Sequence, residues 1–444
     1  MRSEYRKKEK TASSGRVSAG ASLGGASAGT AAGAATRASY LWNSFAGLLN
    51  AGQSVFLLMV ITRIGGLYAA GVFSIAFATG NLLLNLGNYG VRNYQISDVR
   101  ERCAFRDYLW HRVCTASLMI AAAAAYFVYC LTVKDYAPYK AQVVLAMCLL
   151  KTVDVAEEVF DGRLQQRGRL DLAGKIITAR LAVTIAVMVT VLAATGDLLA
   201  AVLAAAGGAA LTSGLCLWGV RRQLAFSFGR FRTDRVGRIF AACFPVCAAN
   251  FLSFYLTNSP KYAIDSLMDE TAQAQYNFVA MPVFVIGLLN LFLYQPILVR
   301  MTLTWNERDR NGFFRLFARI LAGLAAIAAA VLAVGWLWGI PVLSALYATD
   351  LAALRGELMM LLLGGAVLAY DGFLCAVLTI TRSQRVIPLV YLAGAGLALF
   401  AVPHMVAAAG IFGAAAAYTA LMTMIAVLLT ALFARAYRRQ MRVG

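Results

Sequence analysis

The sequence predicts an all-α polytopic membrane protein with twelve transmembrane helices in two six-helix lobes. Hydrophobic residues make up 61% of the chain and charged residues only 14%, against roughly 25% charged residues in soluble domains. The hydrophobic residues form runs long enough to cross a bilayer, which takes about 20 helical residues. Between these runs, arginine-rich connections alternate with connections that hold few basic residues. The runs predict membrane spans, and the alternation predicts their number.

Residues 1–38 form the first predicted element, a tail. A basic start from Arg2 to Lys10 leads into a run of Ser, Gly and Ala with almost no large apolar residue. This composition cannot bury enough surface to offset the entropy lost on ordering. We therefore expect a disordered cytoplasmic tail. We do not expect a secretory signal, because no apolar segment follows the basic start before Tyr40.

Twelve hydrophobic segments follow the tail. We assign residues 39–236 to an N-terminal lobe and residues 237–444 to a C-terminal lobe that ends in a short basic tail. The predicted spans are residues 39–62, 66–90, 108–133, 139–161, 170–194, 197–220, 237–258, 273–299, 313–337, 353–381, 387–405 and 409–434. No connection between them leaves room for a soluble domain, so we expect no fused ATPase, kinase or nucleotide-sugar transferase.

The 40 Lys and Arg residues give the chain a formal net charge of +19. Most of them lie in the connections on one side of the predicted topology, whereas the opposite side holds Arg63, Lys134, Lys140, Lys261 and Arg355. Because positively charged connections stay in the cytoplasm, both termini are predicted to be cytoplasmic. We interpret the charge as a topology signal in contact with membrane lipids, and not as a nucleic-acid surface.

The cysteines and histidines suggest no cofactor. The chain has 8 Cys and 2 His. The cysteines lie mostly within predicted spans and form no CxxC pair, which is typical of small apolar packing residues in membrane helices. His111 and His404 are far apart in the sequence. We therefore predict neither a disulfide nor a metal site.

The two halves of the chain look like copies of each other. Asn50 in the first span has a counterpart in Asn250 of the seventh, and residues 70–76 align with residues 274–280. Six spans separate the copies, so they run in the same direction, as parallel repeats about an axis along the membrane normal do. Paired bundles of this kind usually rock around a shared central cavity, which is the geometry of a transporter.

Ionisable residues are concentrated in the fourth and fifth spans. Each costs at least ~2.5 kcal/mol inside a bilayer, so each is a functional candidate. Glu157 of the fourth span lies beside a helical face that carries Lys151, Asp154, Glu158 and Asp161. Counting outward from the turn near residue 165, Arg180 of the fifth span reaches the depth of Lys151, near the middle of the bilayer.

Two interpretations of this cluster remain open. In the first, Lys151 and Arg180 face the cavity and bind an anionic substrate, the arginine through its bidentate fork and the lysine as a point charge. In the second, the charges form an internal salt-bridge network that holds the fourth span against the fifth. By the same count, Lys175 should lie near Asp154 and Glu157. The two interpretations are compatible.

Further candidates come from other spans. Asn50 and Asn250 are predicted to line the cavity, and Arg63 and Lys261 close the first and seventh spans on the outer side at places that match in the repeat. Asp371 stands alone near the middle of the tenth span. It is a candidate for proton or cation coupling, as is Asp154, although a hydrogen-bonded buried carboxyl explains Asp371 equally well.

Three stretches of the chain have the pattern of a known family. They are residues 88–95 with 97–100, residues 158–162 with Gln165 and 168–171, and residues 260–265. In these stretches the chain resembles Wzx-like polysaccharide-biosynthesis flippases of the multidrug/oligosaccharidyl-lipid/polysaccharide (MOP) exporter superfamily. The resemblance extends over residues 39 to about 435.

The resemblance implies a MATE-like V-shaped fold whose two lobes open to one side of the membrane at a time. It implies a flippase in the cytoplasmic membrane of a bacterium that moves an undecaprenyl-diphosphate-linked oligosaccharide for cell-surface polysaccharide biosynthesis. In relatives, cationic cavity residues meet the diphosphate, and Lys151 and Arg180 are our candidates by position. No bond is made or broken, so no enzyme activity is expected. A polysaccharide polymerase and glycosyltransferases of the same pathway are the expected partners.

Two alternatives have other functions. An ion-coupled (H⁺ or Na⁺) drug or metabolite exporter of the same superfamily often carries an acidic residue in its first cavity helix, but the first span here has none. A membrane-integral glycosyltransferase or polymerase typically has a long outer loop. The longest predicted outer stretches, residues 259–272 and 338–352, are short. A net positive cavity would favour the flippase over the exporter.

Overall fold

The computed structural model describes residues 25–98, 103–224 and 231–442, and the regular elements within these ranges are all helices. Within these ranges, eight helices are long and apolar enough to cross a membrane, so the protein is a multi-pass membrane protein. Residues 1–24 of the predicted tail lie outside the described residues, and helix α1 begins at Gly25, inside the range predicted as tail.

The first half of the chain supplies seven labelled helices. They are α1 (Gly25–Asn88), α2 (Val91–Ser97), α3 (Phe105–Thr132), α4 (Pro138–Gln166), α5 (Leu170–Thr195), α6 (Leu198–Gly219) and the short α7 (Arg221–Leu224). Helix α1 is broken at Gly66, whose φ of 74° suits a residue without a Cβ. Its two arms lie side by side: Asn50 before the break and Asn81 after it line the same cavity.

The second half contains α8 (Thr233–Leu267), α9 (Glu270–Asn306), α10 (Arg310–Val334), a π-helical turn (Gly335–Gly339), α11 (Ile340–Tyr347), α12 (Arg355–Ile380) and α13 (Ile387–Arg442). A break at Ala409 and Gly410 divides α13 into two arms, and Gly410 again has a positive φ, of 57°. Both breaks fall where one predicted span gives way to the next.

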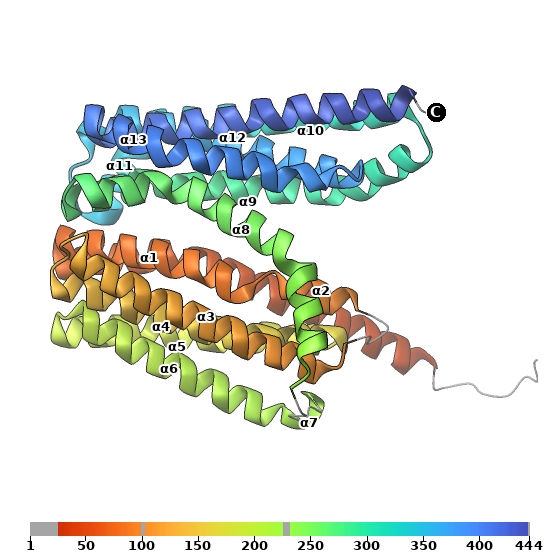
Figure 1. Ribbon diagram of the computed structural model, residues 1–444, viewed down its shortest axis with the longest axis horizontal. Coiled ribbons are helices and arrows are strands. Elements are labelled where there is room, and N and C mark those ends of the chain that lie inside the picture. Colours follow the sequence, from red (N-terminus) through yellow and green to blue (C-terminus); the bar gives the residue numbers. More distant parts are fainter. Residues whose placement is uncertain (1–24, 99–102, 225–230, 443–444) are drawn as a thin grey trace, which may run out of the picture.

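Helices of the same half of the chain lie together. Helices α1 and α3–α6 are grouped on one side of the molecule, and α9, α10, α12 and α13 on the other (Figure 1). Helix α8 runs from one group to the other. Its start packs against the first half, where the Phe240 ring lies 5.0 Å from Tyr89 and 4.1 Å from His111. Pro245 and Pro260 lie inside α8 and each removes a backbone hydrogen bond, which favours bending.

The connections fall at two ends of the molecule. The α8–α9 turn and α11 lie at the end that we call the arginine-poor end, and α2, α7 and the C-terminus lie at the opposite, arginine-rich end (Figure 1). At the arginine-poor end the two halves touch closely. A Cβ placed on Gly71, in the second arm of α1, would overlap the backbone carbonyl of Glu270 and lie 2.8 Å from its Cα. Glycine at position 71 therefore permits this approach.

We predict that Gly71→Ala lowers the thermal stability of the purified protein, because the added methyl group forces α9 away from α1. Overpacking of this kind costs about 1–3 kcal/mol. Gly207→Ala in α6 is the matched control, since a Cβ there meets nothing within 4 Å and alanine favours helix. Equal melting temperatures for the two variants would contradict the close contact.

Candidate functional site

A cavity of about 530 Å³ lies between the two halves of the chain. Helices α1 and α4 line it from the first half, and α8, α9, α12 and α13 from the second. Its polar lining residues are Asn50, Gln53, Ser54, Ser74, Asn81, Lys151, Asp154, Thr257, Asn258, Lys261 and Asn277. Its polar groups come from both halves and include the charged side chains of Lys151, Asp154 and Lys261, so we take this cavity as the candidate substrate site.

The charged lining of the cavity is net positive. It consists of Lys151, Lys261 and Asp154. The Lys151 ammonium lies 3.3 Å from an Asp154 oxygen and 4.8 Å from the centre of the Phe77 ring. For Lys261, no carboxylate within the described ranges forms an ion pair. Lys261 therefore contributes the uncompensated positive charge, and it does so from the half opposite to Lys151.

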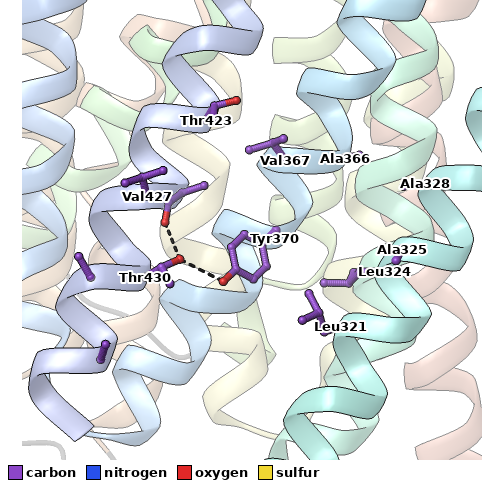
Figure 2. A pocket seen from close by; sticks show the side chains of 13 residues that line it. Leu321, Leu324, Ala325, Ala328, Ala366, Val367, Tyr370, Thr423, Val427 and Thr430 are labelled. Carbon is purple, nitrogen blue, oxygen red and sulfur yellow. Dashed lines mark hydrogen bonds between the residues drawn. The ribbon is translucent and has the colours of Figure 1, made fainter. Parts of the chain in front are cut away.

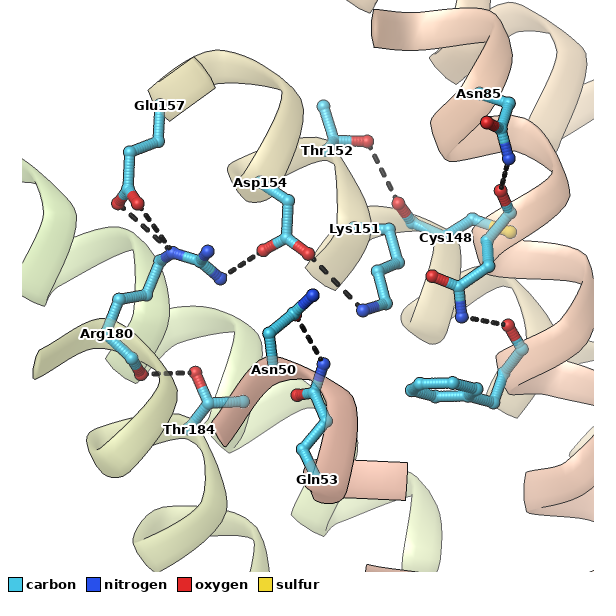
Figure 3. Close-up of polar contacts among 12 residues, drawn as sticks. Asn50, Gln53, Asn85, Cys148, Lys151, Thr152, Asp154, Glu157, Arg180 and Thr184 are labelled. Atoms are coloured by element: carbon cyan, nitrogen blue, oxygen red, sulfur yellow. Dashed lines mark hydrogen bonds and ion pairs between the residues drawn. The ribbon is translucent and has the colours of Figure 1, made fainter. Parts of the chain in front are cut away.

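Arg180 is held in an ion-pair network inside the first half (Figure 3). Its Nε donates to both Glu157 oxygens at 3.1 Å, and its Nη1 donates to Asp154. Ser213 of α6 donates to Glu157 as well. Arg180 is 6% exposed and Glu157 is 2% exposed, and neither lines the cavity. The network thus joins α4, α5 and α6.

Asp154 connects this network to the cavity. One of its oxygens accepts from Arg180 and the other faces Lys151 (Figure 3). Counting residues from the turn predicted that Lys151 and Arg180 lie at one depth, and the structure brings both to the same carboxylate. Arg180 therefore fixes the position of Asp154, and Asp154 positions Lys151 at the cavity wall.

The structure separates two other predicted residues from this group. Glu158 accepts a hydrogen bond of 2.6 Å from Arg112 of α3, whose other nitrogen donates to the Gly87 carbonyl. Lys175 is exposed, and its ammonium lies 5.7 Å from the centre of the Trp42 ring. The expected approach of Lys175 to Asp154 does not occur, because Asp154 pairs with Lys151 and Arg180 instead.

The repeat-related residues also differ in their placement. Asn50 lines the cavity and accepts a hydrogen bond of 3.0 Å from Gln53. Asn250 is exposed on α8 and lies outside the lining, which on this helix begins one turn later at Phe254. Arg63 is exposed at the arginine-poor end. It donates to the carbonyls of Ala345 and Leu346 in the last turn of α11, at 2.9 and 3.1 Å.

Asp371 lies in α12 and is 2% exposed. Neither of its oxygens accepts a hydrogen bond from any residue that the structure describes. Asp371 does not line the cavity between the halves. Its assignment to ion coupling stays a prediction.

Sequence reasoning missed an ionic cluster at the arginine-poor end. Asp265 of α8 pairs there with Lys134 at 2.8 Å and with Lys140 at 2.9 Å. A signal existed in the sequence, because Lys134 and Lys140 are among the few cations of the arginine-poor connections and Asp265 ends one of the family-like stretches. What the sequence did not provide was the pairing, since these residues are far apart along the chain.

A second cavity, of about 620 Å³, lies within the second half between α10, α12 and α13 (Figure 2). Its lining is formed mainly by Leu, Ala and Val side chains, with the Tyr370 and Thr430 hydroxyls 3.0 Å apart. No Lys, Arg, Asp or Glu belongs to this lining. It can accommodate hydrocarbon but has no charged group for an anion, so the smaller polar cavity remains the candidate site.

The sequence profile of the polysaccharide biosynthesis protein family matches residues 37–301, more than half of the chain. The chain belongs to this family. No curated protein sequence matches it. The resemblance read from the three sequence stretches is confirmed.

Solved structures show the same fold. The lipid II flippase MurJ in an inward closed conformation superposes with a TM-score of 0.69 at 12% identity, covering 88% of this chain and 86% of MurJ. An inward-facing multidrug resistance MATE family transporter of the MOP superfamily gives 0.61 at 13% identity, covering 89% and 94%. A mutant of the Vibrio cholerae MATE transporter VcmN gives 0.60 at 12% identity, covering 92% and 98%. This family member therefore has the fold of MOP-superfamily membrane transporters.

We predict that Arg180→Ala destabilises the protein strongly, because it leaves the buried Glu157 and the partly buried Asp154 without their arginine. Removing one partner of a buried ion pair costs about 3–5 kcal/mol. The double variant Arg180→Met with Glu157→Gln should recover part of the loss, since it removes one of the stranded charges. Thermal unfolding in detergent measures both.

Lys175→Ala is the control for these variants, because Lys175 is an exposed cation of the same helix. Its melting temperature should match that of the unmodified protein. If Arg180→Ala melts at the same temperature as Lys175→Ala, the network does not stabilise the fold.

Proposed function

We propose that the protein is a flippase that moves an undecaprenyl-diphosphate-linked oligosaccharide across the cytoplasmic membrane of a bacterium by alternating access. The observation that carries the proposal is the pair of lysines, Lys151 and Lys261, that faces one cavity from opposite halves. Membership of the polysaccharide biosynthesis family and the fold shared with MurJ support the substrate class. Transport involves no bond cleavage, so we propose no enzyme activity.

The proposed topology has twelve spans in two lobes, residues 39–236 and 237–444, with the tail of residues 1–38 and the C-terminus in the cytoplasm. Two of the eight long apolar helices, α1 and α13, are each broken into two arms. Counting these arms separately and adding α4 and α9, which are 29 and 37 residues long, supports twelve. The arginines at the end that holds the C-terminus support its cytoplasmic location.

The cavity can lower the barrier to diphosphate transfer. A charged diphosphate in hydrocarbon is strongly unfavourable unless it is paired or hydrated. Lys261 offers an ammonium that forms no ion pair with a carboxylate of the described residues, and Lys151 can exchange Asp154 for a phosphate oxygen. Asp154 also pairs with Arg180, so releasing Lys151 need not strand a carboxylate. We assign Lys151 and Lys261 to the diphosphate, and Asn50 and the other lining amides to sugar hydroxyls.

An ion-coupled exporter remains the second candidate, and one observation favours ion coupling. Asp371 is a buried carboxyl without a hydrogen-bond partner in the described part of the chain. Together with Asp154, it is our candidate for coupling to H⁺ or Na⁺. The net positive lining of the cavity argues against a cationic drug as cargo. We therefore assign Asp371 to energy coupling of the flippase. As partners of the flippase we propose a polysaccharide polymerase and glycosyltransferases of the same pathway.

We predict that Lys151→Gln and Lys261→Gln each reduce flipping of a fluorescent undecaprenyl-diphosphate oligosaccharide in proteoliposomes. A hydrogen bond to a charged group contributes about 1.5–3 kcal/mol, so the rate should fall roughly ten- to hundred-fold, provided that the contact is made in the rate-limiting step. The readout is the fraction of fluorescent headgroup that an impermeant quencher reaches over time.

Lys175→Gln is the matched control, because it removes one lysine charge outside the cavity and should retain flipping. Wild-type rates for both cavity variants, with both proteins folded, would refute the diphosphate site. No flipping by the wild-type protein would refute the substrate.

A further inference from the structure

Five residues tie the two halves together at the arginine-poor end, and we call them the outer clasp. Lys134 and Tyr136 follow α3, and Lys140 lies in the first turn of α4; Asp265 lies at the end of α8, and Glu270 at the start of α9. Lys134 and Lys140 lie 2.8 and 2.9 Å from Asp265, Tyr136 donates to Asp265, and Lys140 lies 3.1 Å from Glu270.

The clasp is asymmetric in its chemistry. The hydrogen-bond donors all belong to the first half, and the carboxylates that accept from them belong to the second. The Asp265 side chain is completely buried, whereas Lys134 and Lys140 are 15% and 9% exposed. Burial and the neighbouring Asp265 raise the pKa of Tyr136, so its hydroxyl stays protonated and donates. The Asp265 carboxylate therefore lies among three donor groups of the first half.

Separating the halves at this end would remove Asp265 from these donors. Two ammonium groups and a phenol would lose their acceptor together, and removing one partner from a buried ion pair is strongly unfavourable. An incoming oxyanion with several lone pairs can replace the carboxylate. Phosphate oxygens accept such charge-assisted hydrogen bonds from lysines.

Helices α4 and α8 carry residues of both the clasp and the cavity lining. Lys261 lies one turn before Asp265 on α8, so the two side chains lie on adjacent turns of the same face. Lys140 lies about three turns from Lys151 on α4. An anion held between Lys151 and Lys261 would thus find the clasp lysines next, on its way to the arginine-poor end.

We propose that Lys134, Tyr136 and Lys140 form a second anion site, which takes the phosphate oxygens of the cargo as it leaves the cavity. Asp265 occupies this site as an internal substitute and thereby keeps the arginine-poor end closed. Displacing Asp265 couples opening of this end to arrival of the anion. The identity of the cargo rests on the proposed function, whereas the anion site is tested without it.

The test uses inorganic pyrophosphate and two variants that both break the clasp. Asp265→Asn leaves the lysines in place, and the double variant Asp265→Asn with Lys140→Gln removes one of them. Opening is read from labelling of Asn81→Cys, which lines the cavity, by an impermeant thiol reagent added at the arginine-poor face of oriented vesicles. Labelling is scored above the background of the eight native cysteines.

We expect both variants to increase labelling at least threefold, and Asp265→Asn to bind pyrophosphate at least tenfold more tightly than the wild type. The double variant should show the same increase in labelling but bind pyrophosphate no more tightly than the wild type. Both variants should expose Lys151 and Lys261 to the same extent. The difference in their pyrophosphate affinity therefore measures the contribution of Lys140 alone. Asp171→Asn is the control, since it breaks an ion pair with Arg169 outside the clasp, and should match the wild type in both measurements.

Unchanged labelling in Asp265→Asn would overturn the role of the clasp in closure. Equal pyrophosphate affinity in the two variants would overturn the second anion site. If Asp265→Asn does not fold, Glu270→Gln replaces it, because it breaks the Lys140–Glu270 pair at a more exposed carboxylate and should raise labelling less but in the same direction. Failure of the oligosaccharide assay would refute the proposed cargo and leave these outcomes unaffected.

Discussion

The Asp154 carboxylate is shared between a buried arginine and a lysine at the cavity wall, and the arrangement of the first half depends on it. A charge placed among membrane helices must be paired or hydrated. Arg180 meets this requirement through Asp154 and Glu157, and Ser213 extends the network to α6. Three helices are thereby fixed around one guanidinium. The remaining oxygen of Asp154 then holds Lys151 where it reaches the cavity.

The two halves differ in how the cations near the cavity are paired. In the first half each cation near the cavity has a carboxylate partner, whereas the second half contributes Lys261 with no ion pair in the described residues. This imbalance gives the space between the halves its positive character. At the arginine-poor end the cations that reach across to the other half belong to the first half. The second half provides the carboxylates, Asp265 and Glu270. Contacts between the halves are therefore ionic at the place where the proposed transport cycle requires them to break. Ionic partners can be exchanged for an anion, whereas packed apolar surfaces offer no such replacement.

The long apolar helices and their order followed from hydrophobic runs and from the alternation of arginine. The breaks at Gly66 and Gly410 fall where predicted spans meet. Each break uses a glycine with a positive φ, a conformation that glycine adopts without strain. Helical counting placed Lys151 and Arg180 at one depth, and they share a carboxylate. The same counting failed for Lys175, since depth along a helix says nothing about the direction in which a side chain points. Lys175 faces Trp42 on the outside of α5, and Glu158 turns towards Arg112 of α3.

The sequence by itself determined the all-helical, multi-pass character of the protein and the set of charged residues that require an explanation, because these follow from local composition and from the cost of charge in a bilayer. Only the tertiary structure decided which charges are neutralised and which are available. Arg180 is held by two carboxylates, Lys261 has none among the described residues, and Asp265 meets a lysine that lies 131 positions earlier in the chain. Such pairings depend on how helices rotate and pack against one another, and the spacing of residues along a single helix does not contain that information.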